Sequence, residues 1–171
     1  MKKLVLSISV IIIIIIPSCQ QKMDTNREKE AILHVLLDEG ERFAAYDMEG
    51  VAALHIQDET AVRLAGPENL LQGWNDIKTL YEGYIKRNKE MNEKNPVENV
   101  RNLKENVITK VTGKTAWSVC DNVWKWEEGG ETVGYTNRQI TFLEQVKGNW
   151  KISFIAFIPL PETTENDVEE E

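Results

Sequence analysis

Cysteine and histidine are both scarce in this chain of 171 residues, which contains two of each. Cys19 directly follows an apolar N-terminal segment, and we expect it to be modified there. Cys120 then has no partner for an internal disulfide and is expected to be a buried, small apolar residue. The two histidines, His34 and His55, lie on different predicted elements and form no ligand cluster of known zinc spacing. The sequence therefore predicts neither a metal site nor a cofactor.

Other absences exclude whole classes of function. The chain has no glycine-rich phosphate-binding loop and no G-x-S-x-G motif, which argues against nucleotide binding and serine-hydrolase chemistry. Its formal net charge is −8, whereas proteins that bind nucleic acids need clustered positive charge to displace counterions. No polybasic stretch is present that would bind an anionic membrane surface. We therefore expect no nucleic-acid partner, and a membrane contact only through a covalent anchor.

The N-terminus has the pattern of an export signal. Two lysines are followed by the apolar run 4–16 and by a serine directly before Cys19. The run is too short to span a bilayer, which needs about 20 apolar residues. The segment 16–19 resembles the lipobox of bacterial lipoproteins, which implies that Cys19 carries lipid and that residues 1–18 are removed. A plain secretory signal with an incidental cysteine is the alternative, because Pro17 is unusual at that place.

The rest of the chain forms one domain with two short ends. Residues 19–26 are the lipidated cysteine and a polar tether, 27–159 the folded domain, and 160–171 an acid-rich tail that we expect to be disordered. With the lipobox, this organisation predicts a membrane-anchored lipoprotein of the bacterial cell envelope, on the periplasmic or the cell-surface side.

Hydrophobic periodicity predicts an α+β fold. Apolar residues recur at helical spacing over 25–46, 47–55 and 75–91, with Asp47 as the cap of the second helix. Strand-like segments are expected at 60–65, 107–112, 115–126, 132–145 and 150–158, the last four joined by tight turns. The order ααβαββββ predicts helices packed on one face of a curved antiparallel sheet.

Four short motifs occur in a defined order along the domain: 44–47, 54–58, 113–117 and 148–152. Together they resemble the nuclear transport factor 2-like superfamily, and its SnoaL-like branch in particular, over residues 28–159. The resemblance implies a sheet wrapped around the helices as a cone with an internal pocket. Members include isomerases, dehydratases, polyketide cyclases and proteins that only bind or dimerise. The fold alone therefore does not decide the function.

Alternation along the strand 115–126 separates two faces. We assign to the concave side the face whose side chains grade from small to large, as a tapering cavity requires: Ala116, Ser118, Cys120, Asn122, Trp124 and Trp126. A shift of one residue would exchange the two faces. The ligand-binding candidates are side chains expected to face the pocket or to donate hydrogen bonds into it: Tyr46, Trp74, Tyr81, Cys120, Asn122, Trp124, Tyr135, Gln139 and Phe154.

His55 is the candidate acid or base, because histidine titrates near neutral pH without perturbation. Asp58 lies three residues further along and would orient or charge it. Both residues can also be purely structural. A lone histidine at a helix end usually serves packing, and Asp58 can cap the turn that leads into the next strand.

Three functions stay open. We favour a domain that binds a small, largely apolar ligand without catalysis, because the last strand lacks the ionisable group that many SnoaL-like members have there. The second is a cofactor-free isomerase, cyclase or dehydratase that uses His55 and Asp58. The third is an interaction module of the cell envelope. The resemblance also implies a homodimer through the convex sheet face, which would present Trp117, Val119 and Val123.

Overall fold

The computed structural model describes residues 25–66 and 68–160. The predicted signal segment 1–18, Cys19, most of the tether and the tail from residue 161 lie outside the described residues. None of the helices in the described part of the chain is both long enough and apolar enough to cross a membrane.

The described residues form three helices and six strands. In chain order these are α1 (Thr25–Ala44), α2 (Met48–Leu54), β1 (Val62–Leu64), β2 (Leu70–Gln72), α3 (Trp74–Lys94), β3 (Glu98–Thr112), β4 (Thr115–Glu128), β5 (Glu131–Val146) and β6 (Asn149–Pro159). The α+β class and the curved sheet are confirmed. The sequence did not indicate β2, and β3 begins nine residues earlier than the predicted strand.

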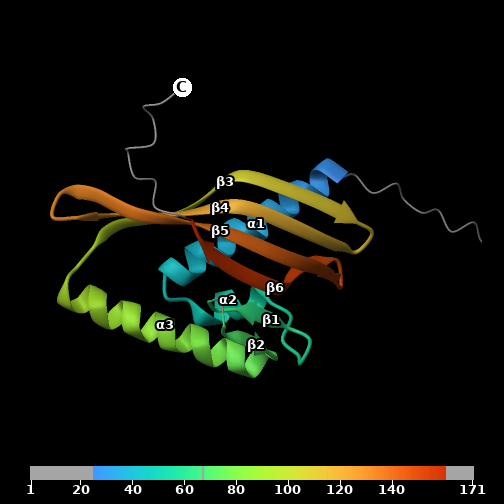
Figure 1. Ribbon diagram of the computed structural model, residues 1–171, viewed down its shortest axis with the longest axis horizontal. Helices are drawn as coiled ribbons and strands as arrows, with labels where there is room; N and C mark the ends of the chain where they lie inside the picture. Colours follow the sequence, from blue (N-terminus) through green and yellow to red (C-terminus); the bar gives the residue numbers. More distant parts are fainter. Residues whose placement is uncertain (1–24, 67, 161–171) are drawn as a thin grey trace, which may run out of the picture.

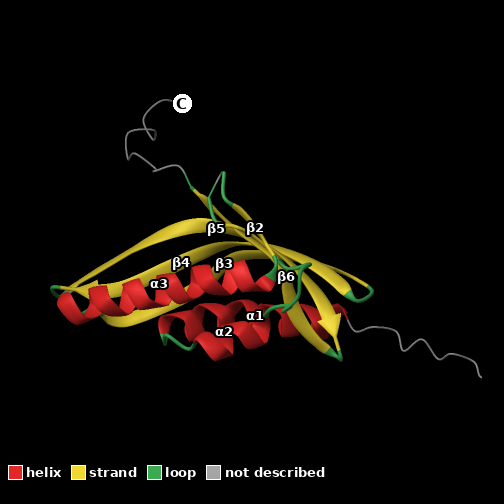
Figure 2. Ribbon diagram, turned by 90° about the horizontal axis from the view of Figure 1, so that it is seen from below, coloured by secondary structure: helices red, strands yellow, loops and turns green. Residues whose placement is uncertain are grey.

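The six strands form one sheet in the order β2-β1-β6-β5-β4-β3. Strands β3 to β6 make the predicted antiparallel meander, whereas β1 lies parallel to β6. The expectation of a wholly antiparallel sheet was therefore wrong at this one pairing. The helices lie on one side of the sheet, which bends over them (Figures 1 and 2).

Local irregularities give the sheet its curvature. The register between β3 and β4 shifts twice, near Asn99 and Asn106, and both asparagines adopt a positive φ of 54° and 51°. A third shift, between β5 and β6, leaves Ser153 as an extra residue opposite Phe142 and Leu143. Bulges of this kind bend a strand and exchange the faces of the residues beyond them.

Two apolar clusters hold the helices to the sheet. The first lies between α1 and the concave face and contains Ile32, Leu36, Ala116, Leu143, Trp150, Ile152 and Ile155. The second joins α2, α3 and the start of β1 through Val51, Ala61, Trp74, Ile77 and Tyr81. The two clusters lie at different parts of the helix layer, and α1, α3 and the sheet enclose a cavity that neither of them fills.

The turn between α1 and α2 has the predicted cap. The Asp47 carboxylate accepts a hydrogen bond from the Gly50 backbone N–H at 2.8 Å and from the Arg42 guanidinium at 2.9 Å. This cap fixes where α2 begins, at Met48, shortly after α1 ends at Ala44.

The convex face of the sheet carries exposed apolar side chains. Ile108, Trp117 and Phe142 are 61%, 36% and 48% exposed, and the Phe142 ring packs edge-on against Phe154 with centroids 5.6 Å apart. Val123 is buried, so it contributes little to the patch that was expected to include it. Apolar surface of this kind is typical of contact sites, and the homodimer stays a prediction.

Candidate functional site

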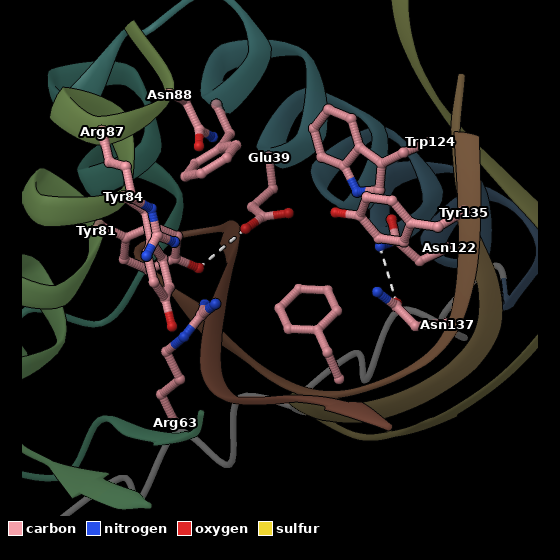
Figure 3. A pocket seen from close by; sticks show the side chains of 12 residues that line it. Glu39, Arg63, Tyr81, Tyr84, Arg87, Asn88, Asn122, Trp124, Tyr135 and Asn137 are labelled. Atoms are coloured by element: carbon pink, nitrogen blue, oxygen red, sulfur yellow. Dashed lines mark hydrogen bonds between the residues drawn. The ribbon is translucent and has the colours of Figure 1, made fainter. Parts of the chain in front are cut away.

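The concave face, α1 and α3 enclose a cavity of about 300 Å³ (Figure 3). Six aromatic side chains form its apolar wall: Phe43, Tyr81, Tyr84, Trp124, Tyr135 and Phe157. The polar part of the lining is Glu39, Arg63, Arg87, Asn88, Asn122 and Asn137. The lining is thus divided equally between aromatic and polar side chains, and small-molecule sites likewise combine an apolar wall with placed polar groups.

Glu39 and Tyr81 form a buried polar pair at the inner end of the cavity. The Tyr81 hydroxyl donates to Glu39 Oε1 at 2.9 Å (Figure 3). The same hydroxyl lies 3.4 Å from His55 Nε2. All three side chains are buried. Burial raises the pKa of Tyr81 well above its ordinary value, and the neighbouring Glu39 raises it further. The hydroxyl therefore keeps its proton and acts as a donor towards Glu39.

His55 belongs to the wall behind this pair. Its ring stacks on Trp74 at a centroid distance of 5.3 Å and meets Tyr81 edge-on at 5.4 Å. Burial, together with the positive charges of Arg63 and Lys151, lowers the pKa of His55 from 6.5 to about 3. The imidazole is therefore neutral at pH 7 and a weak base.

Arg63 brings a positive charge into the same cavity. Its guanidinium lies 4.3 Å from the centre of the Tyr81 ring and 5.1 Å from that of Phe157, which places the cation over two aromatic faces. The residue is 6% exposed, and its Nε and Nη1 have no hydrogen-bond partner among the described residues.

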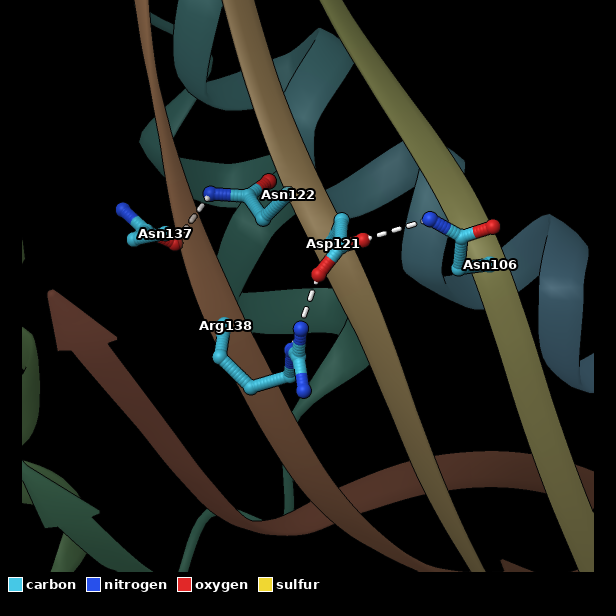
Figure 4. A network of polar contacts seen from close by, with 5 residues as sticks. All are labelled: Asn106, Asp121, Asn122, Asn137 and Arg138. Atoms are coloured by element: carbon cyan, nitrogen blue, oxygen red, sulfur yellow. Dashed lines mark hydrogen bonds and ion pairs between the residues drawn. The ribbon is translucent and has the colours of Figure 1, made fainter. Parts of the chain in front are cut away.

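A second cation, the half-buried Lys104, supports the floor of the cavity. Lys104 Nζ donates to Asn122 Oδ1 at 2.6 Å and to Gln139 Oε1 at 2.7 Å. Asn122 also donates to Asn137 at 3.0 Å, whereas the adjacent Asp121 turns to the other face and binds Arg138 (Figure 4). Burial lowers the pKa of Lys104, while Glu39 opposes that change. The amide network fixes the orientation of Asn122 at the cavity wall.

The cavity adjoins a second hollow of about 370 Å³ near the end of α1. Phe43, Asn88, Trp124 and Tyr135 line both spaces. Tyr46 and Trp126 contribute to the second hollow only, whose wall is more apolar than that of the first. Rings shared by both spaces would contact a ligand longer than one aromatic ring.

The structure brings five of the nine predicted ligand-binding residues to these spaces. Tyr81, Asn122, Trp124 and Tyr135 line the cavity, and Tyr46 lines the adjoining hollow. The remaining four residues do not line them. Cys120 and Gln139 point inward but are buried beneath the lining, and Trp74 belongs to the core of the helix layer.

Phe154 lies on the opposite face of the sheet from the one predicted. Strict alternation from Trp150 and Ile152 places it in the pocket, but the bulge at Ser153 reverses the faces from that residue onward. Phe154 therefore packs against Phe142 outside, and Phe157 lines the cavity in its place.

Asp58 and His55 are not joined by a hydrogen bond in the described part of the chain. Asp58 Oδ1 instead accepts from the backbone N–H and the hydroxyl of Thr60 at 2.8 and 2.6 Å, and these bonds lower its pKa. The carboxylate thus caps the turn before β1, which is the structural interpretation of this residue.

Sequence reasoning missed the charged residues of the cavity, although the two buried ones carried a signal. Glu39 lies three residues after Leu36 and four before Phe43, in phase with the apolar stripe of α1. Arg63 lies two residues after Ala61, on the same buried face of the chain. An ionisable residue that shares the buried phase of an element is rarely buried without a partner or a function.

Among residues 25–66 and 68–160 no group of three or more histidine, cysteine or acidic side chains could hold a metal ion. The cavity offers one carboxylate, the Glu39 group that binds Tyr81.

No protein-family model matches the sequence, and no curated protein matches it either. Several solved structures match the fold. A candidate dehydratase of the NTF2-like family from Streptomyces avermitilis aligns with a TM-score of 0.65 at 15% identity, over 80% of this chain and 98% of that one. An NTF2-like protein with a cystatin-like fold from Novosphingobium aromaticivorans aligns with a TM-score of 0.64 at 15% identity, over 81% and 86%.

A protein of unknown function from Mycobacterium tuberculosis aligns with a TM-score of 0.64 at 14% identity, over 83% of this chain and 82% of that one. At these identities the similarity concerns the fold alone. The chain has the NTF2-like fold, as its four short motifs implied.

Proposed function

We propose that this chain is an exported, lipid-anchored domain that binds a small ligand in its cone cavity without converting it. The observation that carries the proposal is the cavity itself, about 300 Å³ in volume and walled by six aromatic rings. That volume lies at the lower end of the range for small-molecule sites. The rings suit a planar, largely apolar body, and the amides of Asn88, Asn122 and Asn137 offer hydrogen bonds to its polar groups.

The acid–base alternative has weaker support. A base with a pKa of about 3, as His55 has, is almost always unprotonated at pH 7 and takes up a proton poorly. Its expected partner Asp58 is occupied by Thr60, and Glu39 accepts a hydrogen bond from Tyr81. The two carboxylates that could assist His55 are thus already engaged with other side chains.

Native mass spectrometry of the chain from residue 19, with Cys19→Ser, tests the proposal. We expect the wild-type domain to retain added small-molecule mass, or to bind 2-naphthamide supplied as a probe. Asn88→Trp should abolish both, because Asn88 lines the cavity and the adjoining hollow and a larger side chain would fill them. The same spectrum reports whether the domain is the expected homodimer.

Lys86→Trp is the matched control for that variant. Lys86 lies two residues earlier on α3 and is exposed, so an indole there should leave binding unchanged. Equal loss in the two variants would point to general damage to α3. Undiminished binding in Asn88→Trp would contradict the cavity as the site.

The lipid anchor is tested on the full chain expressed in a bacterium. We expect the intact mass to show removal of residues 1–18 and the added mass of acyl chains at Cys19. Two or three acyl chains hold a protein firmly at a membrane, because each buried methylene contributes about 0.8 kcal/mol. Cys19→Ser should therefore appear in the soluble fraction, and a membrane-bound Cys19→Ser chain would rule out this anchor.

A further inference from the structure

The most unusual group in the cavity is the Arg63 side chain. Arg63 is the central residue of β1, and the neighbouring strands place it opposite Leu71 and Ile155. Its guanidinium extends into the cavity towards Tyr81 and Glu39 (Figure 3). The residue is more than nine-tenths buried, so water cannot solvate its charge as it would at the surface.

The edge of this guanidinium is unsatisfied. The rings of Tyr81 and Phe157 interact with its face, at 4.3 and 5.1 Å. Face contacts leave the N–H groups in the guanidinium plane free, and Nε and Nη1 have no hydrogen-bond partner among the described residues. A buried donor that carries charge is costly to leave unpaired, and such groups in native proteins normally have a partner.

No described residue accepts a hydrogen bond from Nε or Nη1. Glu39 lines the same cavity, but no ion pair joins it to Arg63 in the described part of the chain, and Glu39 Oε1 accepts from Tyr81. Lys104 is a second, half-buried cation, and its hydrogen bonds go to the neutral amides of Asn122 and Gln139. One buried and one half-buried cation thus face one buried carboxylate, and exposed Arg87 adds a further positive charge at the rim.

This local excess is opposite in sign to the chain as a whole, whose formal net charge is −8. The positive charge of the cavity is therefore a local feature and does not follow from the charge of the whole chain. A cation with free N–H groups inside an otherwise satisfied aromatic cavity is the arrangement that a bound monoanion would complete.

We infer that the ligand of this cavity carries a carboxylate, which binds the free edge of Arg63 while its planar apolar body lies against the aromatic wall. The inference rests on the proposed function, since it identifies the class of ligand for the same cavity. A carboxylate fits because its oxygens can accept charge-assisted hydrogen bonds from the N–H groups in the guanidinium plane. Arg63 and Lys104 together exceed Glu39 by one positive charge, which a single carboxylate balances.

Calorimetric titration with 2-naphthoate and 2-naphthamide tests the inference. The two probes share one ring system and differ in the charge of one group. The chain from residue 19 with Cys19→Ser should bind the acid at least tenfold more tightly than the amide. Arg63→Gln should remove this preference and still bind the amide, because the aromatic wall is unchanged.

Arg138→Gln is the matched control. Arg138 is also a strand arginine, but it pairs with Asp121 on the convex face, so its replacement should leave the preference intact. Equal affinity for acid and amide in the wild-type chain, or a preference that survives in Arg63→Gln, overturns the carboxylate assignment and leaves the binding function standing. If neither probe binds at millimolar concentration, the binding function and the carboxylate assignment both fail. The wild-type comparison remains decisive even if Arg63→Gln does not fold.

Discussion

Lowering the pH from 7 to 4.5 should reduce the free energy of unfolding of the wild-type domain by about 2–3 kcal/mol, and His55→Gln should abolish most of that loss. The cause is the burial of a neutral imidazole. Burial and the charges of Arg63 and Lys151 lower the pKa of His55 from 6.5 to about 3. The imidazole in the unfolded chain titrates near 6.5, so below that pH the unfolded state binds a proton that the folded state excludes.

The pKa values of His55 in the folded and unfolded states determine in which direction, and over which pH range, the stability changes. The stabilisation from a neutral His55 is complete above pH 6.5 and declines as the pH falls towards 3, by about 1.4 kcal/mol per pH unit. Hydrogen bonds lower the pKa of Asp47, Asp58 and Asp121, and the stabilisation they give is lost chiefly below pH 3.8. The interval from pH 6.5 to 4.5 therefore reports mainly the histidine.

Urea unfolding at a series of pH values measures this effect. His34→Gln is the matched control, because His34 is exposed on α1 and its loss should leave the pH dependence of stability unchanged. A wild-type stability that is flat from pH 6.5 to 4.5 would contradict the burial of a neutral His55. A slope that persists in His55→Gln would assign the titration to another group.

Replacing Gly40 by alanine should destabilise the domain by about 1–3 kcal/mol, although alanine is the better helix former. A Cβ at Gly40 would lie 2.0 Å from Oδ1 of Asn102 on β3. Asn102 is buried and donates to Asn122 Oδ1 at 2.7 Å, so it cannot move aside without breaking the amide network below the cavity. Gly40 thus sets how closely α1 approaches β3.

Gly83→Ala is the matched comparison and should stabilise the domain by about 0.5–1 kcal/mol. Gly83 is exposed on α3, and a Cβ there meets no atom within 4 Å. Chemical denaturation at pH 7 compares the two variants, which make the same change in two helices. A Gly40→Ala domain as stable as the wild type would show that α1 and β3 have room to separate.

Periodicity predicts most of this fold because burial controls the spacing of apolar residues. The stripe of α1, the cap at Asp47 and the two faces of β4 all follow from that rule. Strand β2, three residues long, has no periodic signal to detect. The bulge at Ser153 is invisible to strict alternation, and the prediction for Phe154 therefore places it on the wrong face.

The site was harder to predict because its two buried charged residues occupy positions that face the interior, where apolar residues are expected. Glu39 and Arg63 occupy the buried phase of α1 and β1. Only the tertiary packing of α1, α3 and β1 shows that both charges face one cavity, beside Tyr81. If ionisable residues on the buried face of a predicted element are taken as site candidates, Glu39 and Arg63 are selected and Asp58 is not.

Ligand binding in the cone cavity is tested most directly by the indole N–H signals of the five tryptophans in NMR spectra recorded during titration with 2-naphthamide. Trp124 lines the cavity, Trp74 and Trp150 are buried in the two cores, and Trp117 lies on the convex face. The Trp124 signal should shift most, and the Trp117 signal should stay in place. A shift of Trp117 with no change at Trp124, or no shift at any indole with millimolar probe, would contradict binding in the cavity.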